Sequence, residues 1–264
     1  MAEVFTMVPL PAGRSRTKPR RQGLTMMMDW GMPIESQASL LGLVAPHVDL
    51  AKIVVGTARL YEESYLRRKL ATYRDHDIAP FIGGQFLEYV IRKQGVGGVD
   101  AFLDEACRLG FGAIEVSDNI VPISEENRRK IIKMALSRGL EVHAEVGSKH
   151  DASTAEALVA QATRDFDAGA NVILVEGAEL LRNRQPDQAL IAGLKEGLDL
   201  SRVIFELSGP WIPGTHHTDV YALKVFLVKT FGPDVNLANI LPDAVWETEA
   251  LRMGLSAPGP IHDV

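Results

Sequence analysis

Acidic side chains stand at or near the ends of several short apolar runs in this sequence. A carboxylate within an apolar run is costly to bury unless it is paired with a cation or bound to a metal ion. Several carboxylates on one rim form an oxygen-rich site, which suits Mg²⁺ because this ion prefers carboxylates and keeps water for substrate exchange. For any acid taken singly, a salt bridge to a neighbouring run is the alternative. The acids in such positions are Asp29, Glu115, Asp118, Glu145, Glu176 and Glu206, and we predict that Asp29, Glu115, Glu176 and Glu206 bind the metal.

Two lysines supply the positive charge that crowded carboxylates need. Lys52 lies within an apolar run, and a lysine is rarely buried there without a role. Lys149 follows Glu145 by four positions, just past another apolar run, where a solvated surface lysine is the alternative. Since lysine can act as a general acid or hold a substrate anion, we expect both side chains at the site.

These residues need elements that bring them together. Eight short apolar runs lack the apolar–polar alternation of half-exposed strands, and they are typical of strands buried on both faces of a parallel sheet. Amphipathic stretches such as Val99–Leu109 separate them. This alternation predicts a single (β/α)8 TIM barrel, with a doubly wound open sheet as the alternative. The expected strands cover residues 24–29, 50–55, 78–83, 113–118, 141–147, 171–177, 202–208 and 235–241.

A barrel of this kind carries its active site at the C-terminal ends of the strands, which is where the acids fall. The loops after its seventh and eighth strands often hold phosphate, so Asn236 and Asn239 are candidates for substrate contacts. The glycine pair Gly83-Gly84 permits close approach of the backbone to a ligand.

The composition bounds the function class. The 264 residues are 46% hydrophobic and 23% charged, with a formal net charge of −6, which is typical of a soluble domain and argues against nucleic-acid binding. No apolar run is long enough for a membrane helix, and the lone Cys107 excludes an internal disulfide. We expect a cytoplasmic protein with small-molecule substrates and no nucleic-acid or membrane partner. A homo-oligomer is expected because barrels often associate through their outer helices.

The ends of the chain differ from its centre. Residues 1–17 read as a flexible, basic leader, although their cations could also form a nucleic-acid arm or a phosphate trap. Residues 18–255 form the predicted barrel domain. Residues 256–264 read as an irregular tail, because two prolines and a glycine break any helix there.

In their order and spacing, the motifs resemble one family, the phosphosulfolactate synthases, over nearly the whole chain apart from its tails. The resemblance depends on motifs that are modest singly and specific together. They are Arg21–Thr25 with Asp29, Lys52 with Gly56-Thr57, Gly83-Gly84 with Glu88, Ile114–Asp118, Glu145–Gly147 with Lys149, Glu176-Gly177, Val203–Glu206 and Val235–Ile240.

The resemblance implies a barrel lyase that uses Mg²⁺ to add sulfite to phosphoenolpyruvate, giving (2R)-2-O-phospho-3-sulfolactate in the first step of coenzyme M biosynthesis. It implies that Lys149 protonates the carbon that bears the phosphate, and that Glu145 and Lys52 belong to the catalytic machinery. The substrate contacts that we expect are Arg21, Gly84, Gln85, Ser117, Asn236 and Asn239.

Several positions depart from the family's pattern. Trp30 stands where a lysine is usual, Gln85 replaces a threonine, and Asn119 replaces a glycine. Ala178 replaces an arginine, the natural bidentate partner of phosphate or carboxylate, and residues 207–217 look rewritten. Two alternatives therefore stay open: a related barrel lyase or synthase with a different acceptor or nucleophile, and a non-catalytic, stress-associated relative.

Overall fold

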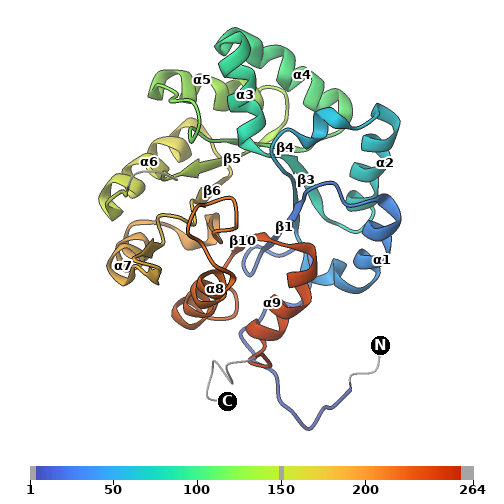
Figure 1. Cartoon of the computed structure of the whole chain (residues 1–264), viewed down its shortest axis with the longest axis vertical. Helices are drawn as coiled ribbons and strands as arrows, with labels where there is room; N and C mark the ends of the chain where they lie inside the picture. Colours follow the sequence, from blue (N-terminus) through green and yellow to red (C-terminus); the bar gives the residue numbers. More distant parts are fainter. Residues whose placement is uncertain (1–3, 149–151, 257–264) are drawn as a thin grey trace.

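Eight parallel strands close into a barrel, and the helices pack around it (Figure 1). The computed structural model describes residues 4–148 and 152–256. The strands follow the order β1-β10-β9-β6-β5-β4-β3-β2 around the barrel. This confirms the predicted (β/α)8 TIM barrel and excludes an open sheet. The strands are β1 (Thr25–Asp29), β2 (Leu50–Ile53), β3 (Ala79–Ile82), β4 (Ala113–Val116), β5 (Glu141–Val146), β6 (Val172–Val175), β9 (Val203–Glu206) and β10 (Leu237–Ile240).

Each predicted run contains one barrel strand, and amphipathic helices connect the strands. A two-stranded hairpin, which the sequence analysis did not anticipate, is inserted after β6 and consists of β7 (Leu181–Arg182) and β8 (Gln185–Pro186). The helices are α1 (Ile34–Val44), α2 (Glu63–Arg74), α3 (Gly84–Gln94), α4 (Val99–Leu109), α5 (Glu125–Leu136), α6 (Ala155–Ala168), α7 (Gln188–Gly197), α8 (His217–Phe231) and α9 (Val245–Arg252).

The interior of the barrel is filled in layers, because alternate residues of a strand point to opposite faces. One buried apolar layer forms a cluster of its own, apart from the larger core under the helices, and comprises Met26, Phe81, Ala113, Leu174, Ile204 and Ala238. Two residues after Ala113, Leu174 and Ile204, the same face carries Glu115, Glu176 and Glu206. The apolar layer therefore lies directly beneath the charged residues described below.

The N-terminal segment contacts the barrel before the predicted domain begins at residue 18. Arg14 is buried, and its guanidinium lies 2.8 Å from Glu249 Oε2 of α9 and 3.2 Å from Asp234 Oδ1. The guanidinium of Arg20 lies 2.8 Å from Asp49 Oδ2, just before β2. These ion pairs fix the segment to the end of the barrel where the strands begin. Among the described residues, no helix is both long and apolar enough to span a membrane.

Candidate functional site

A pocket of about 110 Å³ lies at the C-terminal ends of the strands. Its charged lining comes from four barrel residues, each less than 10% exposed: Lys52, Glu115, Glu145 and Glu206. Each of them lies two positions after another inward-facing residue of its own strand. Because residues two apart in a strand point to the same face, all four side chains point into the barrel. The rest of the lining is neutral and consists of Met28, Trp30, Val54, Val55, Gly83, Gly84, Gln85, Trp211 and Asn239.

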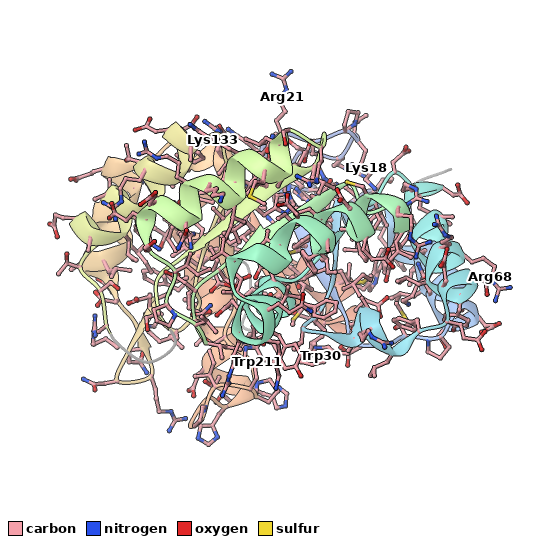
Figure 2. The ribbon with its side chains drawn as sticks, turned by 90° about the horizontal axis from the view of Figure 1, so that it is seen from above. Lys18, Arg21, Trp30, Arg68, Lys133 and Trp211 are labelled. Carbon is pink, nitrogen blue, oxygen red and sulfur yellow. The ribbon has the colours of Figure 1, made fainter. Side chains whose placement is uncertain are left out.

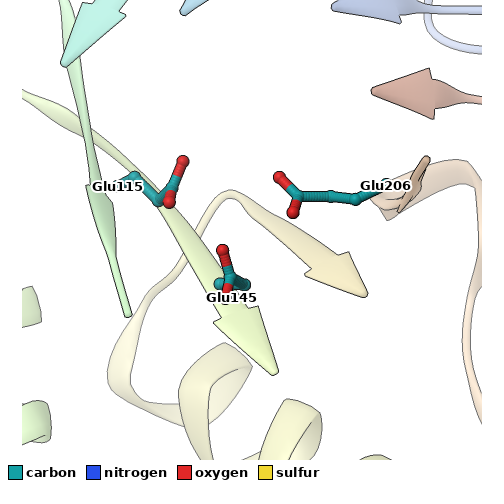
Figure 3. A group of neighbouring side chains, drawn as sticks. All are labelled: Glu115, Glu145 and Glu206. Atoms are coloured by element: carbon teal, nitrogen blue, oxygen red, sulfur yellow. The ribbon is translucent and has the colours of Figure 1, made fainter. Parts of the chain in front are cut away.

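Three glutamates from three strands converge in this pocket (Figure 3). Glu115, Glu145 and Glu206 each offer a carboxylate oxygen, and these oxygens lie within 4.8 Å of one another. Burial raises the pKa of Glu115 to about 8, and the neighbouring carboxylates add to this rise while Lys52 opposes it. A buried set of convergent carboxylate oxygens suits a hard divalent cation. We call these three residues the carboxylate cluster.

Lys52 forms ion pairs with two members of the carboxylate cluster. Its Nζ lies 2.6 Å from Glu115 Oε2 and 3.0 Å from Glu206 Oε1. Burial acts to lower the pKa of Lys52, but the adjacent glutamates outweigh it and hold the pKa above its usual value. The lysine therefore carries a positive charge and offsets part of the negative charge of the cluster.

The third member of the cluster is held from the neighbouring loop. The side-chain amide of Asn119 donates to Glu145 Oε1, and Arg128 of α5 donates to the backbone oxygen of Glu145 at 2.6 Å. The loop that carries Asn119 is fixed in turn by the buried Glu88 of α3, which accepts the backbone N–H of Val121 at 3.0 Å. Ser117 donates to the same Glu88 carboxylate at 2.5 Å.

Helix α3 begins at the pocket with Gly84, which cannot carry a larger side chain without a clash. A Cβ atom on Gly84 would lie 2.3 Å from Ser117 Oγ and 2.9 Å from Glu115 Oε1. The first turn of α3 can therefore approach the carboxylate cluster because Gly84 has no side chain. Since the N-terminal end of a helix attracts anions, this turn is suited to the charged group of a ligand.

Asn239 presents an unsatisfied oxygen in the pocket. Its backbone is left-handed at φ 60°, and its side-chain amide donates to Leu207 O at 3.3 Å. Its Oδ1 atom is buried and has no hydrogen-bond partner. Because a buried acceptor without a donor is costly, this oxygen is suited to a ligand or a cation.

Two indole rings flank the pocket at its outer side. Trp30 follows β1 and Trp211 lies in the loop after β9, and their ring centroids are 6.1 Å apart with a tilt of 43°. Trp30 remains 48% exposed. Figure 2 shows the pair at one edge of the molecule. Three of the positions that depart from the family's pattern, Trp30, Gln85 and Trp211, thus line the pocket.

The structure does not bring Asp29 and Glu176 into the carboxylate cluster. The carboxylate of Asp29 contacts Lys69 Nζ at 2.5 Å and the hydroxyl of Tyr73 at 2.6 Å, both from α2. Asp29 is one position out of phase with the inward-facing Met28, so it faces α2 outside the barrel. Glu176 is buried and accepts the N–H of Ala178 at 3.0 Å.

Other predicted site residues also lie away from the pocket. Arg21 is exposed at the edge of the molecule opposite the two tryptophans (Figure 2). Asn236 uses its amide to donate to Val203 O at 2.9 Å, where β9 begins, and its Oδ1 accepts the N–H of Leu24 at 2.9 Å. Arg21 precedes β1 and Asn236 precedes β10, whereas the pocket lies where the strands end. Their positions in the chain therefore explain why they do not reach the pocket. Lys149 lies outside the described residues.

Sequence reasoning missed the buried carboxylate of Glu179, which binds Ser148 and Ser153. Glu179 accepts the N–H of Ser148 at 2.8 Å, and the N–H and hydroxyl of Ser153 at 2.8 and 2.6 Å. It lies in the connection after β6, where no strand period points to it. The arginines of that connection are used locally, since Arg182 pairs with Asp187 and Arg184 pairs with Asp219.

Comparisons with known proteins agree with this architecture. A family model described as (2R)-phospho-3-sulfolactate synthase (ComA) matches residues 13–257. The chain belongs to this family. The phosphosulfolactate synthase of Methanocaldococcus jannaschii is 31% identical over 246 residues, covering 89% of this chain and 92% of that protein. The phosphosulfolactate synthase of Methanothermobacter thermautotrophicus is 30% identical over 253 residues, covering 90% and 91%.

The chain is also similar to a plant protein. Protein HEAT-STRESS-ASSOCIATED 32 of Arabidopsis thaliana is 23% identical over 248 residues, covering 83% of this chain and 82% of that protein. Among solved structures, 3-hexulose-6-phosphate synthase from Salmonella typhimurium superposes with a TM-score of 0.54 at 13% identity, covering 88% of this chain and 99% of that chain. The structural likeness shows the barrel fold.

Proposed function

We propose that the protein is a phosphosulfolactate synthase that adds sulfite to phosphoenolpyruvate with Mg²⁺. The observation that carries the proposal is the buried cluster of three glutamates with Lys52, in a chain that the family model matches over residues 13–257. The reaction forms a carbon–sulfur bond without a redox step, which places the enzyme among the lyases.

The carboxylate cluster is our candidate for the metal ligands, and Asn239 Oδ1 is an additional oxygen in the same pocket. The residues fit the ion, because Mg²⁺ takes a few carboxylates and completes its shell with water and substrate oxygens. Bound there, Mg²⁺ would supply electrostatic stabilisation of the negative charge that develops on the substrate carboxylate. We leave Asp29 out of this set because Lys69 and Tyr73 already use its carboxylate.

The chain's own residues would bind the substrates and move one proton. Lys52 and the first turn of α3 at Gly84 and Gln85 are placed to hold anionic groups of phosphoenolpyruvate. The sulfite sulfur donates its electron pair to the methylene carbon, and the electron pair of the C=C bond moves toward the carboxylate. Lys149, in the family-like Glu-Val-Gly-x-Lys motif, would then give a proton to the carbon that bears the phosphate.

The direct test is to incubate the purified protein with phosphoenolpyruvate, sulfite and Mg²⁺ and to follow the phosphorus resonance. We expect a new phosphate ester with the mass of phosphosulfolactate, and no product when sulfite or Mg²⁺ is left out. The matched variants are Glu206→Gln, which should abolish turnover, and Glu126→Gln, an exposed glutamate in the first turn of α5 that should not. Folded, metal-supplied protein that makes no new ester would contradict the proposal.

A different nucleophile is the second candidate, and the tryptophan pair favours it. Trp30 and Trp211 give the pocket mouth an apolar surface, which suits a sulfur nucleophile with a carbon substituent better than inorganic sulfite. The same incubation with small organic thiols in place of sulfite distinguishes the two by product mass. A thioether product formed faster than the sulfonate would favour the second candidate.

A further inference from the structure

The ammonium of Lys52 lies on the carboxylates that we propose as metal ligands. Its two partners at 2.6 and 3.0 Å, Glu115 and Glu206, are two of the three residues of the carboxylate cluster. A divalent cation of the Mg²⁺ or Mn²⁺ type binds carboxylate oxygens at about 2.0–2.2 Å. Two cations drawn to the same two carboxylates repel each other strongly inside a buried pocket. The ion pairs of Lys52 and a bound divalent cation therefore compete.

We propose that Lys52 is an exchangeable counter-ion of the metal site. Its ammonium occupies the oxygens of Glu115 and Glu206 until a divalent cation binds, then leaves them and becomes the anchor for a substrate anion. The inference deepens the proposed function and rests on its metal site, although it does not depend on the identity of the nucleophile.

The pocket contains an oxygen that the lysine does not satisfy. Asn239 Oδ1 is buried and without a hydrogen-bond partner, and the residue lines the same pocket as Lys52 and the carboxylate cluster. Lys52 donates to Glu206 and pairs with Glu115. The donor set in the pocket is thus larger than one ammonium uses, as expected if a second kind of cation binds there.

The geometry of Lys52 permits the exchange. A Cβ on Gly83 would lie 3.4 Å from Lys52 Cε, so the stem of the lysine runs along the glycine backbone just before α3. Lysine carries its charge at the end of a flexible four-carbon stem. Rotation about the bonds of that stem can move the ammonium off the carboxylate cluster to another part of the same pocket. The exchange predicts an order of binding in which the divalent cation precedes phosphoenolpyruvate.

Manganese is a suitable probe, because free Mn²⁺ is measured directly by electron paramagnetic resonance and needs no turnover. We compare the wild type with Lys52→Met and Lys52→Arg. The matched control is Lys224→Met, a buried lysine of α8 paired with Glu247 of α9, away from the pocket. Lys52→Met should bind Mn²⁺ at least tenfold more tightly than the wild type. Lys52→Arg should bind it several-fold more weakly, since guanidinium holds carboxylates more firmly, and Lys224→Met should match the wild type.

A thermal measurement guards against poor folding of Lys52→Met. Mn²⁺ should raise its unfolding midpoint by more than it raises that of the wild type, because the metal replaces the missing counter-ion. Equal Mn²⁺ affinity in wild type, Lys52→Met and Lys52→Arg would overturn the exchange, as would weaker binding by Lys52→Met.

The Mn²⁺ measurement tests the exchange and the product assay tests the proposed function, so each proposal can be overturned without the other. Conversion of phosphoenolpyruvate with equal Mn²⁺ affinities in all variants would overturn the exchange and leave the proposed function intact. Tighter Mn²⁺ binding by Lys52→Met, together with no conversion of phosphoenolpyruvate by the wild type, would support the exchange and overturn the proposed reaction. Protein that binds no Mn²⁺ would overturn both.

Discussion

At the scale of single residues, two buried acids, one on β1 and one on β5, have different tasks. Asp29 pairs with Lys69 and Tyr73 behind the barrel, whereas Glu145 belongs to the carboxylate cluster inside it. A buried ion pair broken on one side leaves an uncompensated charge, but removing one of several like charges relieves repulsion. The two acids therefore give opposite results when their charge is removed.

We expect Asp29→Asn to lower the free energy of unfolding by about 3–5 kcal/mol, because it leaves the buried Lys69 without its counter-ion. Glu145→Gln should keep or raise that free energy and lower turnover at least about 100-fold, as loss of one electrostatic group at a reacting centre does. Urea unfolding and initial rates measure the two effects. Loss of turnover in Asp29→Asn at unchanged stability would contradict this division of roles.

The pH dependence of stability follows from Glu115. Burial raises its pKa to about 8 in the folded protein, whereas an unfolded glutamate has a pKa near 4.5. Between these values the folded state binds the extra proton, so the contribution to stability is complete below about pH 4.5 and is lost as the pH rises through 8.

Without divalent cations, the wild type should therefore lose stability relative to Glu115→Gln as the pH rises from 5.5 to 8.5. Urea unfolding of both proteins in a chelator across that range measures the difference. A pH-independent difference would show that Glu115 does not change its protonation in the folded protein.

At the scale of elements, Glu179 fastens both ends of the connection from β5 to α6. It accepts hydrogen bonds from Ser148 on one side and Ser153 on the other, so one carboxylate holds two residues that flank the undescribed segment 149–151. Since the barrel strands do not depend on these bonds, Glu179 acts on the loop more than on the fold.

Glu179→Ala should increase the rate of tryptic cleavage after Lys149 and, if Lys149 is the proton donor that we propose, lower turnover about 10–100-fold, because a positioned proton donor contributes about that much or more. Ser153→Ala removes only the hydroxyl bond to Glu179 and should have a smaller effect on both. Limited proteolysis with mass spectrometry gives the cleavage rate. Unchanged cleavage in Glu179→Ala would contradict the role of Glu179 in holding the loop.

The elements also show what the sequence could predict. The absence of alternation located all eight strands, and the period of two is enough to direct Lys52 and Glu115 inward and Asp29 outward. The partners of Asp29 on α2 could not be predicted, because they depend on how a helix packs on the barrel. The contacts of Glu88, and the role of Glu179, could not be predicted for the same reason, since they depend on loops with no repeating pattern.

At the scale of the whole molecule, the N-terminal segment joins parts of the chain that are far apart in sequence. Arg14 pairs with Glu249 and Asp234, and its guanidinium also donates to Gly23 O at 2.9 Å. The sequence analysis predicted a flexible, basic leader for this segment, with its cations in solvent. Composition could not distinguish the buried Arg14 from its exposed neighbour Arg16.

Arg14→Met should lower the free energy of unfolding by about 3–5 kcal/mol, because the buried Glu249 loses its partner. Removal of residues 1–12, which end just before the match to the family model begins, should leave it unchanged. Urea unfolding of both proteins gives the comparison. Equal stability of Arg14→Met and the wild type would show that the segment is not needed to close the barrel.

The tryptophan pair gives the pocket its own fluorescent probe. The chain has three tryptophans, of which Trp30 and Trp211 line the pocket mouth, while Trp246 packs against His47. In a Trp246→Phe protein, all indole emission comes from the mouth. Its emission spectrum should then change when a ligand enters the pocket. Rapid mixing with metal, phosphoenolpyruvate and nucleophile in turn would give the order in which they bind.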